Sequence, residues 1–273
     1  MRNKSNSGPP LIAEALLLIP FLLLGSAAVA PAGYIISKFI DVPWYLLSLV
    51  LITSSLLSLW YPVEYIAAVL SRKSRKPSKE ELVRFKTVIE TIERKAGIQP
   101  RKWIIVVEKS SSLNAFTSGR HTLGVTTAAL ALSNKIFEAV IAHELGHQLN
   151  RDTWSTAIRA WVMSPLRLIV RVAQAGGFLF AAAAVFSGAA LFPAALFALT
   201  VWFASIPVLL LMPLTAYVQR RNEIAADAVA SALGYRDELA SMIMISQKDE
   251  LTGWKRLTAS HPEPENRLQA LYR

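Results

Sequence analysis

The sequence predicts a mainly α-helical, multi-pass membrane protein with about four transmembrane helices and a small α+β cytosolic domain that is split by a transmembrane hairpin. The first observation is composition: 53% of the 273 residues are hydrophobic and only 18% are charged, whereas a soluble domain is roughly one quarter charged. The second is the recurrence of apolar segments that are long enough to cross a bilayer. The third is that clusters of Lys and Arg flank these segments, as topology signals do.

The charge balance and the lack of cysteine narrow the classes of function. The chain has 29 Lys and Arg against 19 Asp and Glu, a formal net charge of +10. Because the basic residues flank apolar segments and no nucleic-acid motif is present, we expect a lipid bilayer rather than nucleic acid as the partner. There is no cysteine, which excludes disulfides and thiol nucleophiles. Any metal site must therefore use His, Asp and Glu.

The first two predicted membrane spans are residues 11–32 and 42–70. Each can cross a hydrocarbon core of about 30 Å as a helix of about 20 residues. Glu14 and Glu64 lie near the ends of these spans, where we expect lipid headgroups or water to reach them.

A cleaved signal peptide is the alternative interpretation of the first span, since Ala28-Val29-Ala30 is similar to a cleavage site. The apolar stretch is long for a signal peptide, and Pro31 would directly follow the cut. We therefore predict a retained membrane anchor.

The following region predicts a cytosolic α+β domain. Residues 71–80 read SRKSRKPSKE, and the positive-inside rule places this basic segment in the cytosol. Ser78 and Glu81 form a capping box and Gly97 suits a helix end, which predicts an amphipathic helix between them. Short β-rich runs predict strands at residues 103–107, 113–118 and 123–126. Residues 134–150 predict a further helix.

A second hydrophobic block at about 173–217 is too long for one crossing. Pro193 divides it, so we predict two spans, 173–192 and 194–217, that form a hairpin with both basic ends in the cytosol. We predict four segments along the chain. Residues 1–70 form two transmembrane helices, and residues 71–160 form the first part of the cytosolic domain. Residues 161–217 form an interfacial segment with the hairpin, and residues 218–273 form the rest of the cytosolic domain.

The pattern HExxH is formed by His143, Glu144 and His147. Positions four apart on a helix share one face, so both imidazoles can bind one zinc ion. Zinc lowers the pKa of a bound water to about 7, and Glu144 can then take its proton as general base. About 0.003 chance matches are expected in such a chain, so we interpret the pattern as a metal site rather than as two unrelated surface histidines.

A catalytic zinc ion needs a third protein ligand and an open fourth position. Glu223, just past the predicted hairpin, is the best candidate, and His261 is the alternative. Asp227 follows Glu223 by one helical turn and can accept a hydrogen bond from the far nitrogen of a zinc-binding imidazole. An exposed acidic pair at a membrane boundary is the other interpretation of these two carboxylates.

Further motifs follow one another in a distinctive order. HELGH at 143–147 is followed by Arg151-Asp152, and Glu223-Ile-Ala-Ala-Asp227 comes after the hydrophobic block. The Leu113–Phe116 segment precedes the HELGH helix, and Ser260-His261-Pro262 continues to Arg267 near the C-terminus. Together these motifs resemble those of the HtpX-like membrane metalloproteases, which are related to the type I CAAX prenyl proteases. The order and the hydrophobic layout agree across nearly the whole chain.

The resemblance implies that His143, His147 and Glu223 bind one zinc ion per chain and that Glu144 is the general base. Asp227 would then orient a zinc-bound imidazole, that of His143.

The resemblance also implies how a peptide is bound. Asn114, Ala115 and Phe116 would form an edge strand for an extended substrate, with Asn114 holding the substrate backbone, and His261 would stabilise the oxyanion. A turn residue and a loop histidine are the alternatives for Asn114 and His261. Arg267 is interpreted as a helix-surface or structural ion-pair residue, and Asp152 as either a helix cap or a support of the site.

We therefore predict a zinc metalloendopeptidase of the cell (plasma) membrane, with its protease domain facing the cytosol. The resemblance implies membrane or membrane-proximal, misfolded polypeptides as substrates. A CAAX-type prenyl protein endopeptidase is the first alternative, and a membrane protein with a non-catalytic zinc site is the second. Intramembrane ligands would favour metal transport, but the three candidate ligands fall outside the predicted spans.

Overall fold

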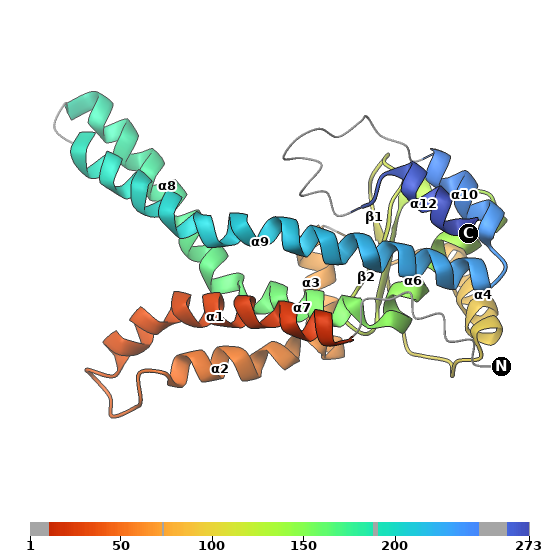
Figure 1. Ribbon diagram of the computed structural model, residues 1–273, viewed down its shortest axis with the longest axis horizontal. Coiled ribbons are helices and arrows are strands. Elements are labelled where there is room, and N and C mark those ends of the chain that lie inside the picture. The colour runs from red at the N-terminus through yellow and green to blue at the C-terminus, as the bar shows by residue number, and fades with distance from the viewer. Residues whose placement is uncertain (1–10, 73, 188–190, 246–260, 273) are drawn as a thin grey trace. The chain divides into compact units, whose positions relative to one another are not determined.

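The computed structural model describes residues 11–72, 74–187, 191–245 and 261–272, and it is mainly helical (Figure 1). The described part of the N-terminal half contains six helices, one of them 3-10, and three strands: α1 Leu11–Ile36, α2 Leu46–Ser54, η1 Ser55–Leu59, α3 Tyr61–Arg72, α4 Lys79–Ala96, β1 Ile104–Glu108, β2 Ala115–Ser118, β3 Thr122–Thr126 and α5 Thr127–Leu130. The described helices that follow are α6 Asn134–Asn150, α7 Asp152–Val162, α8 Ser164–Ser187, α9 Leu191–Ala232, α10 Arg236–Ile245 and α12 Pro264–Leu271.

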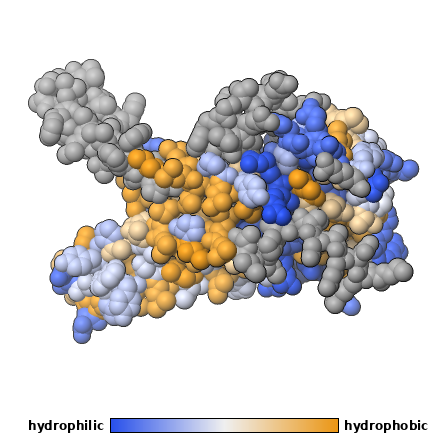
Figure 2. Space-filling view, in the orientation of Figure 1, coloured by the Kyte–Doolittle hydropathy of each residue, from blue (hydrophilic) through white to orange (hydrophobic). Residues whose placement is uncertain are grey.

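The chain divides into two compact units, each built from segments that are distant in sequence. One unit contains residues 1–16, 57–158 and 216–273, and the other contains residues 17–56 and 159–215. The first unit holds the sheet and the motifs that predict a metal site. In Figure 2, hydrophobic residues gather over α1 and α2, and hydrophilic residues gather over α10 and α12.

One described helical segment, Glu14–Ile36 of α1, is long and apolar enough to cross a membrane, with a mean hydropathy of 2.2. The second predicted span is not one straight helix, so that prediction is wrong in this respect. Residues Leu46–Leu59 and Tyr61–Leu70 are bent by 85° at the break between them. Near this break the hydroxyl of Ser55 donates to a carbonyl in the preceding turn, at Ile52, and Pro62 lacks the N–H that a continuous helix would use.

The last two predicted spans fall on α8 and α9, and they remain predictions. The position of the turn between them was predicted wrongly, because Pro193 lies in the first turn of α9. Proline is tolerated there, since the first N–H groups of a helix have no partner within it. Residues 188–190, between the two helices, lie outside the described part. Helix α9 continues past the apolar block to Ala232.

The predicted helix after the basic segment is confirmed as α4. The Ser78 side chain accepts from the backbone N–H of Glu81, whose carboxylate accepts from the N–H of Ser78. Gly97 ends the helix in the left-handed conformation, at φ 66°. The apolar face of α4, which includes Phe85 and Ile92, packs into a core with α6 and the sheet.

The predicted strands are confirmed and form one mixed sheet in the order β1-β3-β2. Strand β3 lies in the centre, parallel to β1 and antiparallel to β2, and Phe116 of β2 pairs with Gly124 of β3. A Cβ on Gly124 would collide with the Phe116 ring, which explains the glycine. Strand β2 therefore forms one edge of the sheet, and α6 packs against this strand.

Candidate metal centre

Helix α6 carries two histidines on one face. It matches the predicted range of 134–150, and it ends where Arg151 adopts the left-handed conformation, at φ 62°. His143 is 4% exposed and Glu144 is 7% exposed. The rings of His143 and His147 lie 4.9 Å apart and nearly perpendicular to each other. The four-residue spacing therefore brings both imidazoles to one buried location.

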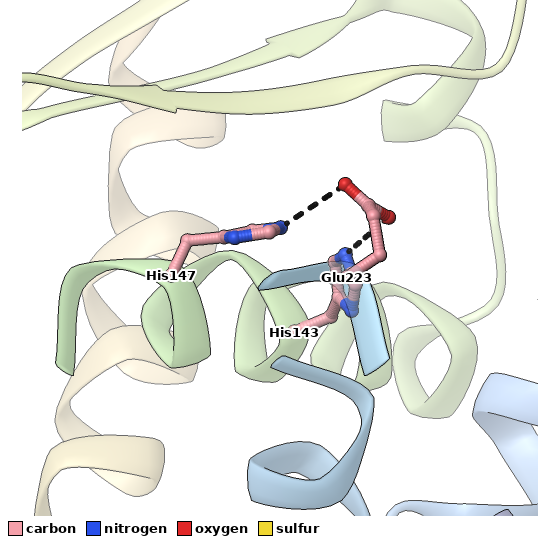
Figure 3. A group of neighbouring side chains, drawn as sticks. All are labelled: His143, His147 and Glu223. Carbon is pink, nitrogen blue, oxygen red and sulfur yellow. Dashed lines mark ion pairs between the residues drawn. The ribbon is translucent and has the colours of Figure 1, made fainter. Parts of the chain in front are cut away.

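Helix α9 brings a carboxylate to the same location. Glu223 lies with its oxygens 3.6 Å from Nε2 of His143 and 3.4 Å from Nε2 of His147 (Figure 3). One candidate ligand atom from each of the three residues lies within 4.8 Å of the others. Helices α6 and α9 approach closely because residue 146 is glycine; a Cβ there would lie 2.9 Å from Cα of Ala226.

These separations suit a shared metal ion better than direct hydrogen bonds. A hydrogen bond between an imidazole nitrogen and a carboxylate is usually about 2.7–2.9 Å long. Two ligands of a tetrahedral zinc ion with bonds of about 2.0–2.1 Å stand roughly 3.3 Å apart. The nitrogen and carboxylate donors are also of the types that zinc accepts. The three residues therefore fit a zinc ion.

Two further carboxylates lie behind the imidazoles. Oδ1 of Asp227 is 2.8 Å from Nδ1 of His143, and Oδ2 of Asp152 is 2.9 Å from Nδ1 of His147. Each carboxylate fixes the orientation of one ring and leaves its Nε2 facing Glu223. The contact of Asp152 was left open by the sequence, although an acid two residues after a helix that ends at Asn150 was a usable signal.

Arg267 completes a buried ion pair with Asp227. Its Nε and Nη2 donate to the two carboxylate oxygens of Asp227 at 2.8 and 2.6 Å. Both residues are buried, at 7% and 1% exposure. Helix α12 is thereby tied to the carboxylate that orients His143. Of the two interpretations of Arg267, the structural ion pair is confirmed and the helix surface is wrong. The partner of Arg267 was not predicted, because the contact depends on tertiary packing.

His261 lies beside Glu223 rather than apart from it. Its Nδ1 is 3.0 Å from Oε2 of Glu223, and its side chain is 67% exposed. Ser260, the first residue of the C-terminal motif, lies outside the described residues. His261 is therefore an exposed neighbour of the candidate ligand Glu223.

Glu144 lies next to strand β2. Oγ1 of Thr117 donates to Oε2 of Glu144 at 3.1 Å, a contact that sequence reasoning missed because it depends on how β2 packs on α6. Asn114 is exposed just before β2, and its backbone N–H and C=O bind Thr126. Ala115 is half-buried in the strand, and the Phe116 side chain is buried in the core below the sheet.

The charges of the centre shift several pKa values. Burial lowers the pKa of His143, but the hydrogen bond and charge of Asp227, helped by Glu223, outweigh it and raise the pKa to about 9. Burial raises the pKa of Glu223, but the nearby imidazoles of His143, His147 and His261 hold the pKa well below its ordinary value. Burial also raises the pKa of Asp227, but the hydrogen bonds from Arg267 and the contact with His143 together lower it by more. The pKa of Asp227 therefore lies below its ordinary value.

This geometry agrees with the chain's relationship to known proteins. The model of peptidase family M48 matches residues 79–273, which is more than half of the chain. The chain belongs to peptidase family M48. The match covers both helices that carry the candidate ligands, and it confirms the family resemblance predicted from the motifs.

Relatives of this M48 chain carry the name protease HtpX homologue. The chain is 32% identical over 200 residues to the homologue from Acidiphilium cryptum, a match that covers 68% of this chain and 63% of the relative. It is 33% identical over 117 residues to one from Pelotomaculum thermopropionicum, covering 41% of each, and 31% identical over 125 residues to one from Pyrococcus abyssi, covering 44% and 42%. The chain thus spans less than two thirds of the length of these relatives.

The fold of this M48 chain is similar to the crystal structure of Ste24p from S. mikatae. The TM-score is 0.54 at 18% sequence identity, and the match covers 96% of this chain and 63% of the other. At that identity the similarity concerns the fold alone.

The raised pKa of His143 predicts how the stability of the protein depends on pH after treatment with a chelator. The folded-state pKa of His143, about 9, exceeds the ordinary value of 6.5. The protonated imidazole therefore stabilises the folded state fully below pH 6.5, and this stabilisation is lost as pH rises to about 9. The contribution of His143 to this loss should be roughly 3 kcal/mol. Thermal unfolding in detergent with chelator, from pH 6 to pH 9.5, measures it.

The matched variant for this measurement is His143→Gln, which should decline less than the parent over that range. A part of the decline remains in the variant, because burial lowers the pKa of His147 but Asp152 and Glu223 raise it well above the ordinary value. An equal decline in the variant, or a parent that becomes more stable as pH rises, would contradict the assignment of the raised pKa to His143.

Proposed function

We propose that this protein is a zinc-dependent endopeptidase. The observation that carries the proposal is the convergence of two imidazoles from α6 and one carboxylate from α9, with Glu144 one residue from the first imidazole. His143, His147 and Glu223 would hold the zinc ion, which when bound polarises a carbonyl and makes a water more acidic. Membership of a peptidase family supports the same reaction.

The residues around the centre have distinct tasks in the proposed reaction. Glu144 accepts a proton from the attacking water on a carboxylate oxygen and later gives it to the departing amine. The hydroxyl of Thr117 donates to the other carboxylate oxygen, Oε2, and thereby fixes the orientation of Glu144. Asp227 and Asp152 hold the two imidazoles in place through their Nδ1 atoms.

Strand β2 offers a place for the peptide. As an edge strand it pairs only with β3 among the described strands, so the backbone groups of Ala115 and Thr117 on its other side can pair with an extended peptide. Phe116 would serve through its backbone, because its side chain is buried. The Asn114 side chain would hold the peptide backbone at one end, and the exposed ring of His261 would stabilise the developing oxyanion.

Membrane or membrane-proximal polypeptides that have lost their fold are the proposed substrates. The support is the apolar helix α1, which is long enough to cross a membrane, and an edge strand suited to extended chain, together with relatives that are named protease HtpX homologues. We also propose that the protein lies in the cell membrane with the protease domain on the cytosolic side. The basic segment at 71–80 and the basic residues that follow the second hydrophobic block support this orientation.

The general base is tested by Glu144→Gln. The variant should keep one zinc ion per chain but lose at least about 100-fold in the rate of cleavage of fluorescently labelled casein, because the amide cannot take the proton. Zinc content by mass spectrometry and initial rates are measured on the same preparations. Glu90→Gln, which changes an exposed carboxylate on α4, is the control; a Glu144→Gln variant as active as this control would refute the mechanism.

The positioning role of Thr117 is tested by two substitutions. Thr117→Val keeps the shape but removes the hydroxyl, and it should lower kcat about 5-fold with KM changed less than about 2-fold, as expected for one lost hydrogen bond of roughly 1 kcal/mol. Thr117→Ser keeps the hydroxyl and should retain most of the activity. Equal losses in both variants would show that packing in β2 matters rather than the contact with Glu144.

A further inference from the structure

The N-terminal apolar helix carries a carboxylate that is buried in the protein. Glu14 lies in the first turn of α1 and is only 7% exposed. The expectation that water or lipid headgroups reach it is therefore wrong. Burying a carboxylate costs several kcal/mol unless partners compensate for the lost hydration. Polar partners must therefore stabilise Glu14 at this position.

Two partners of Glu14 come from the helices that support the candidate metal centre. Nδ2 of Asn222, on α9, donates to Oε1 of Glu14 at 2.8 Å, and the hydroxyl of Ser155, on α7, donates to Oε2. Asn222 and Ser155 are themselves buried, at 5% and 7% exposure. A single carboxylate therefore joins α7 and α9.

Each partner stands next to a residue of the centre. Asn222 directly precedes Glu223, the candidate ligand on α9. The Ser155 hydroxyl lies 3.0 Å from the carbonyl oxygen of Asp152, whose carboxylate binds Nδ1 of His147. The position of Glu14 thus affects the placement of Glu223 through the neighbouring Asn222, and that of His147 through Asp152.

We propose that Glu14 is a positioning residue of the zinc centre, so that the first turn of α1 is part of the catalytic unit. Through its contacts with Asn222 on α9 and Ser155 on α7, Glu14 fixes the distance between these two residues. The proposal rests on the proposed function in so far as it takes the centre to bind zinc, but it does not require that the protein cleave any particular substrate.

Zinc affinity of the full chain in detergent, measured by competition with a chromophoric chelator, tests the proposal. Glu14→Leu keeps the approximate volume but accepts no hydrogen bond, and it should raise the zinc Kd about 10-fold, the lower end of the effect of residues that support metal ligands. Glu14→Gln should stay within about 3-fold of the parent, because its amide can still pair with the Asn222 amide and the Ser155 hydroxyl. Glu90→Leu, on the exposed face of α4, should leave the Kd unchanged.

Thermal unfolding in chelator shows whether each variant is folded. If Glu14→Leu does not fold, Ser155→Ala, which removes one of the two contacts, should still raise the Kd about 3-fold. A folded Glu14→Leu or Ser155→Ala variant with the parent's Kd, or a parent that binds no zinc, overturns the proposal. A parent that binds zinc in this manner but cleaves no peptide refutes the proposed function and leaves the role of Glu14 intact.

Discussion

The close approach of α6 and α9 is the constraint on which the candidate centre depends. His143 and His147 come from one helix and Glu223 from another, and the three meet only because Gly146 lets the backbone at Ala226 come near. A side chain at position 146 would separate the two helices at the level of the metal site. The glycine within HELGH is thus explained by the distance between the two ligand-bearing helices.

This approach buries several ionisable groups, and each is compensated by a partner. Asp227 and Asp152 lie against the Nδ1 atoms of the two histidines, and Arg267 neutralises Asp227. Removing one member of such a set would leave an unpaired buried charge, which is costly. The centre is therefore held by residues of α7, α9 and α12 that lie up to about 120 positions from the HExxH motif. This spread explains why the motifs of the family are distributed over so much of the chain.

The sequence predicted those features that depend on neighbouring residues. The capping box at Ser78 and the range of α6 were predicted correctly because caps and helical periodicity are local. The 85° bend in the second apolar segment was missed, since hydropathy gives length but not straightness. The partners of Glu14, Thr117 and Arg267 were not predicted for another reason: each contact joins elements that only the tertiary fold brings together.

X-ray absorption at the zinc edge of the purified protein tests the central claim most directly, because it reports the atoms bound to the metal. The account predicts one zinc ion per chain with two imidazole nitrogens and carboxylate or water oxygens at about 2.0–2.1 Å, and it predicts that Glu223→Ala removes an oxygen ligand or the metal itself. A sphere with fewer than two imidazoles, or one that Glu223→Ala leaves unchanged, would contradict it.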